Sequence, residues 1–156
     1  MKKGLLVKLI PHIFAVLVFL LVAVIFCAPT LQGKVLNQQD VTLWKGTAQQ
    51  SLEYKDKYGH FPLWTNSVFS GMPAYTIAME PAHTIPVGYV YGLMTLWLPK
   101  PMNFFFLACI CFYFLCLAFR IKPWVGVLAS LAYAYSTFDP VIIAVGHDTQ
   151  MTAIAL

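Results

Sequence analysis

Apolar residues occur in four blocks along this chain, and polar residues gather in the segments between them. The blocks cover residues 9–28, 85–99, 101–119 and 123–138. An amphipathic helix of a soluble domain repeats its apolar residues every three to four positions, and these blocks lack that spacing. They are instead continuous enough to lie in a bilayer. The pattern predicts an all-α polytopic membrane protein.

The first block predicts an uncleaved transmembrane helix. At about 1.5 Å per residue, residues 9–28 extend about 30 Å, which is the thickness of the hydrocarbon core. A cleavable signal peptide is the alternative, because it also combines a basic start with an apolar run. However, Phe26 stands where a cleavage site needs a small residue. We therefore expect residues 1–8 to be a cytoplasmic start and residues 9–28 to be the first span.

The second block, residues 85–99, is predicted to be an interfacial helix. It would extend about 22 Å, which is too short to cross the hydrocarbon core. It also contains Pro86. If it did cross, Arg120 and Lys122 would face the outside, against the preference of basic residues for the cytoplasm. Residues 29–100 are therefore predicted to form one large external loop.

The third and fourth blocks are predicted to be two further spans, residues 101–119 and 123–138, joined by a cytoplasmic turn at 120–122. Asp139 and Pro140 are expected to end the last span, so that residues 139–156 form a second external segment. Because an apolar pattern continues to the last residue, we expect residues 1–156 to be the N-terminal part of one domain of a longer chain. One face of the last span repeats small residues every four positions, which favours close helix packing: Gly126, Ser130 and Ala134.

The charges agree with this membrane topology. Lys2, Lys3 and Lys8 precede the first span, which predicts a cytoplasmic N-terminus. Charged residues make up 10% of the chain, against about 25% in soluble domains. The net charge is +4, but the basic residues are scattered, so we expect no nucleic-acid partner. The cysteines all lie in apolar blocks without metal-binding spacing: Cys27, Cys109, Cys111 and Cys116.

Candidate chemistry lies in the external segments. Asp40 follows the first span and precedes an apolar repeat that predicts an amphipathic helix ending near Gly59: Val41, Trp44, Ala48 and Leu52. Asp139, His147 and Asp148 form a second polar group, and we expect both groups to face one cavity. A carboxylate there can act as a general base or bind a hard cation. The alternative is that Asp40 only caps its helix and that Asp139 only begins a turn.

Five short motifs occur in a characteristic order: GKVLNQQD at 33–40, FPLW at 61–64, FSGMP at 69–73, AYAYS at 132–136 and GHD at 146–148. Together with the basic start and the aromatic third block, this order resembles the beginning of the YfhO-like bacterial membrane proteins. These proteins are similar to the GT-C glycosyltransferases. The resemblance covers nearly the whole chain.

The resemblance implies a multi-pass enzyme of the bacterial cytoplasmic (inner) membrane. Such an enzyme transfers a sugar from a polyprenyl-phosphate-linked donor to a cell-envelope acceptor on the outer face. Asp40 matches the catalytic acid of the first external loop, and a divalent cation, Mg²⁺ or Mn²⁺, is a candidate cofactor with Asp40 as its ligand. This chain has one acid where the family pattern has an adjacent pair. Further residues match, or lie near, positions expected to bind substrate: Trp64, Asp139, His147 and Asp148.

A non-catalytic polytopic membrane protein is the alternative, such as a flippase, a channel or a scaffold for envelope assembly. In that class the acidic residues would only stabilise the ends of helices. The lipid bilayer is a partner in both classes, whereas only the enzyme needs a lipid-linked sugar donor.

Overall fold

The computed structural model describes residues 2–78 and 87–156, and most of these residues are helical. The chain divides into two compact units, Met1–Leu36 with Val87–Leu156 and Asn37–Pro86. The first unit contains α1 (Lys2–Phe26), α2 (Ala28–Leu31), α4 (Val87–Met94), α5 (Met102–Ala118), α6 (Pro123–Ala134), α7 (Phe138–Val145) and α8 (Asp148–Ala155). The second contains α3 (Gln39–Tyr58), β1 (Trp64–Thr65), β2 (Met72–Pro73) and the 3₁₀ helix η1 (Ala74–Thr76).

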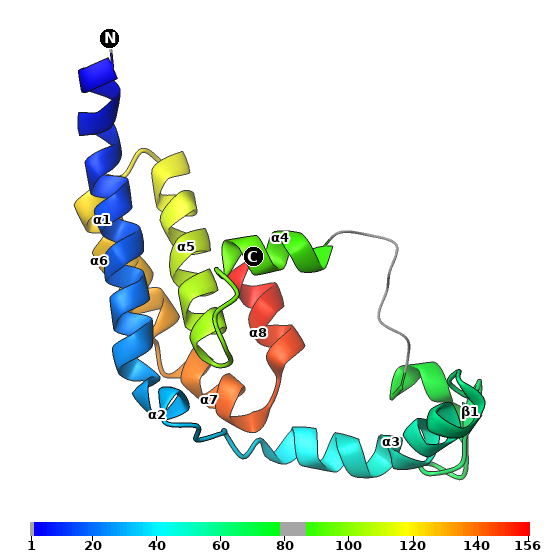
Figure 1. The fold of residues 1–156 in the computed structure, drawn as a ribbon. Helices are drawn as coiled ribbons and strands as arrows, with labels where there is room; N and C mark the ends of the chain where they lie inside the picture. The colour runs from blue at the N-terminus through cyan, green and yellow to red at the C-terminus, as the bar shows by residue number, and fades with distance from the viewer. Residues whose placement is uncertain (1, 79–86) are drawn as a thin grey trace. The chain divides into compact units, whose positions relative to one another are not determined.

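Three helices of the first unit, α1, α5 and α6, pack against one another (Figure 1). Near the start of α1, Nδ1 of His12 lies 2.8 Å from the hydroxyl of Tyr113. Near its end, the ring of Phe26 meets that of Phe105 edge to face, with centroids 5.1 Å apart. Helix α1 is therefore antiparallel to α5. In Figure 1 the start of α1 and the α5–α6 turn lie at one end, and α2 and α7 lie at the other.

The predicted small-residue face of α6 is confirmed as the surface that packs on α5. Gly126, Ser130 and Ala134 are all buried. A Cβ atom added at Gly126 would lie 3.3 Å from the Cβ of Cys116 and 3.3 Å from the ring of Tyr113. The Ser130 hydroxyl donates a hydrogen bond to the Gly126 carbonyl oxygen at 2.7 Å, so its polar group is satisfied inside this contact.

The end of the predicted helix 123–138 is wrong. Helix α6 ends at Ala134, and after a short break α7 begins at Phe138 with its axis bent by 43°. Asp139 and Pro140 therefore begin a helix instead of ending one. Proline fits this place because the first turn of a helix does not use its backbone N–H groups within the helix.

Among the described residues, the helix Val7–Phe26 is long and apolar enough to cross a membrane, with a mean hydropathy of 2.9. The bent pair α6 and α7 also passes this test if the two helices count as one span. Helix α5 is apolar, but with 17 residues it is too short to pass. Only 17% of the α1 span is buried by the protein. Most of its apolar surface thus lacks protein contacts, and the complete multi-pass topology stays a prediction.

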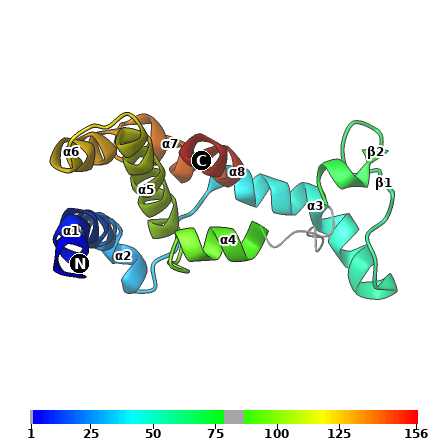
Figure 2. The ribbon, with the colours of Figure 1, turned by 90° about the horizontal axis from the view of Figure 1, so that it is seen from above.

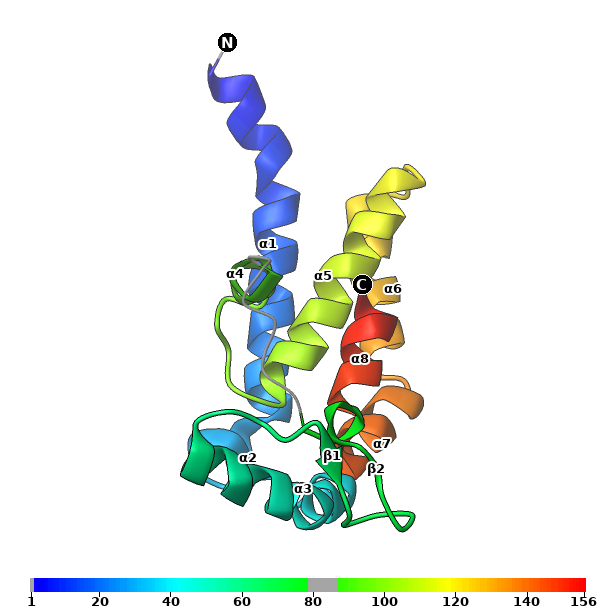
Figure 3. The ribbon, with the colours of Figure 1, turned by 90° about the vertical axis from the view of Figure 1, so that its right-hand side faces the viewer.

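Helix α4 is shorter than the predicted interfacial helix 85–99, of which residues 85 and 86 lie outside the described residues. The chain turns back after α4, and the indole of Trp97 lies so close to Gly92 that a Cβ there would be 2.6 Å from it. Figure 3 shows α4 end-on while α1 and α5 stand upright, so α4 lies across their direction. This orientation agrees with an interfacial position, which stays a prediction.

The second unit is built on α3, which confirms the predicted amphipathic helix and its end at Gly59, a residue with a left-handed φ of 80°. Its buried residues are the small residues Ala48 and Ser51, and the β1–β2 hairpin belongs to the same unit (Figure 2). The Ser67 hydroxyl donates a hydrogen bond to the Thr47 carbonyl oxygen at 2.8 Å. The described part of the predicted external loop in this unit, residues 37–78, therefore contains defined helices and a hairpin.

Candidate functional site

A polar cluster lies where α4, α5 and α8 meet in the otherwise apolar first unit. The Lys100 ammonium and the Asp148 carboxylate form an ion pair. The Asn103 amide nitrogen donates a hydrogen bond of 2.9 Å to the hydroxyl of Tyr91. We refer to these four residues as the Lys100 cluster. It combines one cation, one carboxylate and two neutral groups that can bind a polar head group.

The Lys100 cluster is partly open to solvent. The side chain of Lys100 is 63% exposed and that of Asp148 is 21% exposed. Burial raises the pKa of the Tyr91 phenol above its ordinary value of 10.0. The hydrogen bonds of the phenol and the charge of Lys100 lower this pKa, but by less. Tyr91 therefore stays protonated at neutral pH and keeps a hydroxyl proton that it can donate.

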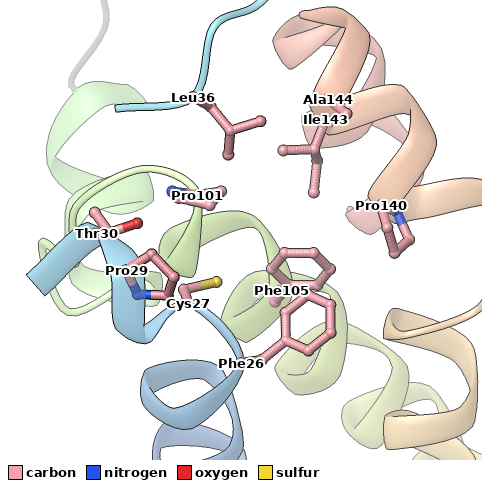
Figure 4. Close-up of a pocket in the computed structure, with 10 residues that line it drawn as sticks. All are labelled: Phe26, Cys27, Pro29, Thr30, Leu36, Pro101, Phe105, Pro140, Ile143 and Ala144. Atoms are coloured by element: carbon pink, nitrogen blue, oxygen red, sulfur yellow. The ribbon is translucent and has the colours of Figure 1, made fainter. Parts of the chain in front are cut away.

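An apolar pocket of about 160 Å³ also lies in the first unit (Figure 4). The end of α1, the segment after it, the start of α5 and the middle of α7 form its walls. Figure 4 shows Leu36, Pro101, Phe105 and Ile143 around one common space. The complete lining is Phe26, Cys27, Pro29, Thr30, Leu36, Pro101, Phe105, Pro140, Ile143 and Ala144.

The apolar pocket and the Lys100 cluster share the segment 100–105 at the start of α5. Pro101 and Phe105 line the pocket, while Lys100 and Asn103 belong to the cluster. The Lys100 ammonium also lies 5.6 Å from the centroid of the Phe104 ring. Residues that line the apolar pocket thus alternate with residues of the Lys100 cluster along the segment 100–105.

Of the predicted acidic group at 139–148, only Asp148 joins the Lys100 cluster. Asp139 is 2% exposed, and its Oδ2 has no hydrogen-bond partner among the described residues. A substrate can reach it only if the surrounding helices move. His147 is exposed at the N-cap position of α8, and its Nδ1 lies 2.9 Å from Oε1 of Gln150.

Asp40 lies in the first turn of α3 in the second unit and is partly exposed. The N-cap position belongs to Gln38, and Asp40 lies two residues further on, inside the first turn. A carboxylate in the first turn still interacts favourably with the positive end of the helix. Asp40 also shares a helix face with Trp44, four residues further on.

Trp64 shapes the hairpin of the second unit. Its indole N–H donates a hydrogen bond of 3.1 Å to Oδ1 of Asn66. Its ring covers Gly71, where a Cβ would lie 2.6 Å from the indole nitrogen. Gly71 has a φ of +123°, so glycine is required there for two reasons. The predicted role of Trp64 in substrate binding stays a prediction.

The predicted groups belong to different units: Asp40 and Trp64 to the second, and Asp139, His147 and Asp148 to the first. The shared cavity therefore stays a prediction. The described residues contain no group of three His, Cys, Asp or Glu side chains that could hold a metal ion. A Mg²⁺ or Mn²⁺ ion bound by Asp40 stays a prediction. The chemistry below uses no metal.

Sequence reasoning missed Tyr91, Lys100 and Asn103. Two signals pointed to them: Lys100 stands between two prolines at the end of an apolar block, and Asn103 is a lone amide at the start of an aromatic block. Their partners are distant in sequence, however. Lys100 and Asp148 are separated by 48 residues, so only the fold brings them together.

No family model, no curated protein and no solved structure matches this chain. The resemblance to the YfhO-like proteins therefore rests on the five short motifs and their order. A functional proposal has to be argued from the residues of the two units.

Proposed function

We propose that this chain is the N-terminal part of a GT-C-like, multi-pass glycosyltransferase of the bacterial cytoplasmic membrane. Its donor would be a sugar linked to a polyprenyl phosphate, and its acceptor a cell-envelope glycan or lipid on the outer face. The observation that carries the proposal is the segment 100–105 at the start of α5, which contributes residues both to an apolar pocket and to the Lys100 cluster.

A lipid-linked sugar has the two-part chemistry that this arrangement suits. The apolar pocket can hold part of the isoprenoid chain, since burying apolar surface contributes about 25 cal/mol per Å². The phosphate then lies near the ammonium of Lys100, which binds it through a charge-assisted hydrogen bond. Asn103 and Tyr91 offer further polar groups for the head group.

Asp40 is the proposed general base. Its carboxylate takes the proton of the acceptor hydroxyl while the hydroxyl oxygen attacks the anomeric carbon of the donor sugar. A new glycosidic C–O bond forms, the C–O bond to the phosphate breaks, and the polyprenyl phosphate leaves with the bonding electrons. One carboxylate suffices for this proton transfer, in agreement with the single acid at this position.

The arrangement of the helices supports the proposed topology. The start of α1 and the turn with Arg120 and Lys122 lie at the same end of the first unit, opposite α2 and α7 (Figure 1). Basic residues prefer the cytoplasmic side. That end is accordingly the cytoplasmic one, and the apolar pocket lies at the outer end.

The topology can be tested by cysteine labelling in intact cells. In a variant without the four native cysteines, an impermeant maleimide should label a cysteine at Lys57 and should leave one at Lys122 unlabelled until the membrane is opened. Both positions are exposed, so access depends on the side of the membrane. Labelling of Lys122→Cys in intact cells, or protection of Lys57→Cys, would contradict an outer active site.

The function can be tested with the full-length protein in nanodiscs, by following labelled sugar from a polyprenyl-phosphate donor to envelope acceptors. We expect Lys100→Gln to raise KM for the donor about tenfold with little change in kcat, because a charge-assisted hydrogen bond contributes about 1.5–3 kcal/mol. Lys122→Gln, at the other end of the unit, is the matched control. Loss of the exposed Lys100–Asp148 ion pair should cost less than about 1 kcal/mol of folding free energy.

Two results would contradict the proposal. Absence of transfer with every envelope acceptor, together with movement of the intact lipid-linked sugar across the bilayer, would favour the non-catalytic flippase alternative. Equal donor KM values for the Lys100→Gln and Lys122→Gln variants would remove the Lys100 cluster from the donor site.

A further inference from the structure

A second pocket, of about 450 Å³, lies within the second unit. Its walls come from α3, from the segment just after α3 and from η1, and three aromatic side chains dominate them: Trp44, Phe61 and Tyr75. We refer to it as the aromatic pocket. Its volume falls in the range of about 300–1,000 Å³ that is usual for small-molecule sites.

Two of the three rings are fixed by contacts within the unit. The indole N–H of Trp44 donates a hydrogen bond of 2.7 Å to the carbonyl oxygen of Ile77. The Lys55 ammonium lies over the Phe61 ring, 4.4 Å from its centroid. A ligand that meets fixed rings loses less free energy to ordering them, so the pocket is preorganised.

The aromatic side chains remain open to solvent although they line a hollow. Trp44 is 45% exposed and Tyr75 is 66% exposed. Each leaves apolar ring surface in water, at a cost of about 25 cal/mol per Å² that burial would recover. Rings that belong to a hydrophobic core would be buried, and these rings are not. Side chains that insert into a membrane protrude, as Leu63 and Phe69 do with 90% and 86% exposure, whereas these rings line a hollow.

We infer that the aromatic pocket binds a neutral sugar ring. One face of a pyranose presents C–H groups, which carry partial positive charge and pack on the negative face of an aromatic ring. Its hydroxyl groups can meet the polar groups of Lys55, Tyr75 and Thr76, which also line the pocket. A purely apolar ligand would leave these polar groups unused.

The position of the aromatic pocket suggests its role. Asp40 and Trp44 are four residues apart on α3 and share one helix face, so the pocket begins about one helical turn from the proposed base. A bound sugar can extend a hydroxyl toward Asp40. The pocket is thus the acceptor site, a role that rests on the proposed function, whereas its capacity to bind sugar does not.

Saturation-transfer NMR on the full-length protein in nanodiscs tests the binding, with maltotriose and tri-N-acetylchitotriose as probes and no donor present. We expect saturation to pass from protein aromatic protons to the C–H groups of at least one trisaccharide. Tyr75→Ala should weaken that binding at least tenfold, and Tyr75→Phe should retain most of it. Tyr89→Ala is the matched control, because Tyr89 is 77% exposed but lies on α4.

Absence of saturation transfer to both trisaccharides would overturn the inference, as would equal binding by the Tyr75→Ala and Tyr89→Ala variants. The transfer assay separates this inference from the proposed function. Sugar binding without any transfer would contradict the proposed function alone. Transfer in which Tyr75→Ala leaves the acceptor KM unchanged would remove the aromatic pocket from the acceptor site.

Discussion

Replacement of Asp40 by Asn should lower sugar transfer by about 10²-fold or more, while expression and membrane insertion stay near normal. The amide keeps the size of the side chain but cannot take a proton from the acceptor hydroxyl. Removal of a positioned general base usually costs a factor of about 10²–10⁴. The measurement is kcat for transfer of labelled sugar by the full-length variant.

The structure predicts a small effect of this substitution on folding. Gln38 occupies the N-cap position of α3, and Asp40 lies in the first turn. Asn keeps the size of the side chain, and the variant loses the interaction of a charge with the helix dipole, about 0.3–1 kcal/mol for a surface residue. A stabilising role and a catalytic role thus predict different results for the same substitution.

Asp56→Asn is the matched control. Asp56 is exposed in the last turn of the same helix, where a negative charge is unfavourable beside the C-terminal carbonyl groups. Its substitution should leave transfer unchanged and should not destabilise α3. Wild-type kcat in the Asp40→Asn variant would end the assignment of Asp40 as the base.

The local elements could be predicted from the sequence where one physical signal dominates. Continuous hydrophobicity placed the first helix, which the structure extends over residues 2–26. A near-helical apolar repeat followed by Gly59 placed α3 and its end. Small residues at every fourth position of 126–134 identified the face that packs on α5. Each of these features depends on residues within a few turns of one another.

Features that depend on distant contacts could not be predicted in the same way. The Asp139–Pro140 pair is typical of a turn, yet here it begins α7, because a proline is equally compatible with the first turn of a helix. The contact of the Trp64 ring with Gly71 depends on a hairpin whose strands are two residues long. A sequence pattern carries little information about such short strands.

The residues of the candidate site show the same difference between local signals and distant contacts. Asp40 was proposed because it lies in the polar segment after the first apolar block, and Asp148 because it lies in a polar motif. The Lys100 cluster and the aromatic pocket each combine segments that are far apart in the sequence. A sequence contains the residues of such a site but not their proximity, which the packing of α4, α5 and α8 or of α3 and η1 provides.

Replacement of Gly126 by Leu should lower the free energy of unfolding of the first unit by about 1–3 kcal/mol, the usual cost of adding bulk to a packed contact. A Cβ alone would already lie 3.3 Å from Cys116 and from the Tyr113 ring, and a leucine side chain would have to displace α5. The better helix propensity of leucine offsets at most about 1 kcal/mol of this loss. Thermal unfolding in detergent micelles, followed by near-UV circular dichroism, measures the effect.

Ala132→Leu is the control, since Ala132 is exposed on the same helix and additional bulk there meets no neighbouring helix. Its unfolding midpoint should equal that of the wild type, and Gly126→Ala should lie between the control and Gly126→Leu. Disruption of the α5–α6 contact should also raise KM for the donor, because the start of α5 and the two residues before it contribute Lys100, Pro101, Asn103 and Phe105 to the proposed donor site. A wild-type midpoint for Gly126→Leu would contradict the close packing of α6 on α5 and, with it, the rigid support of the donor site.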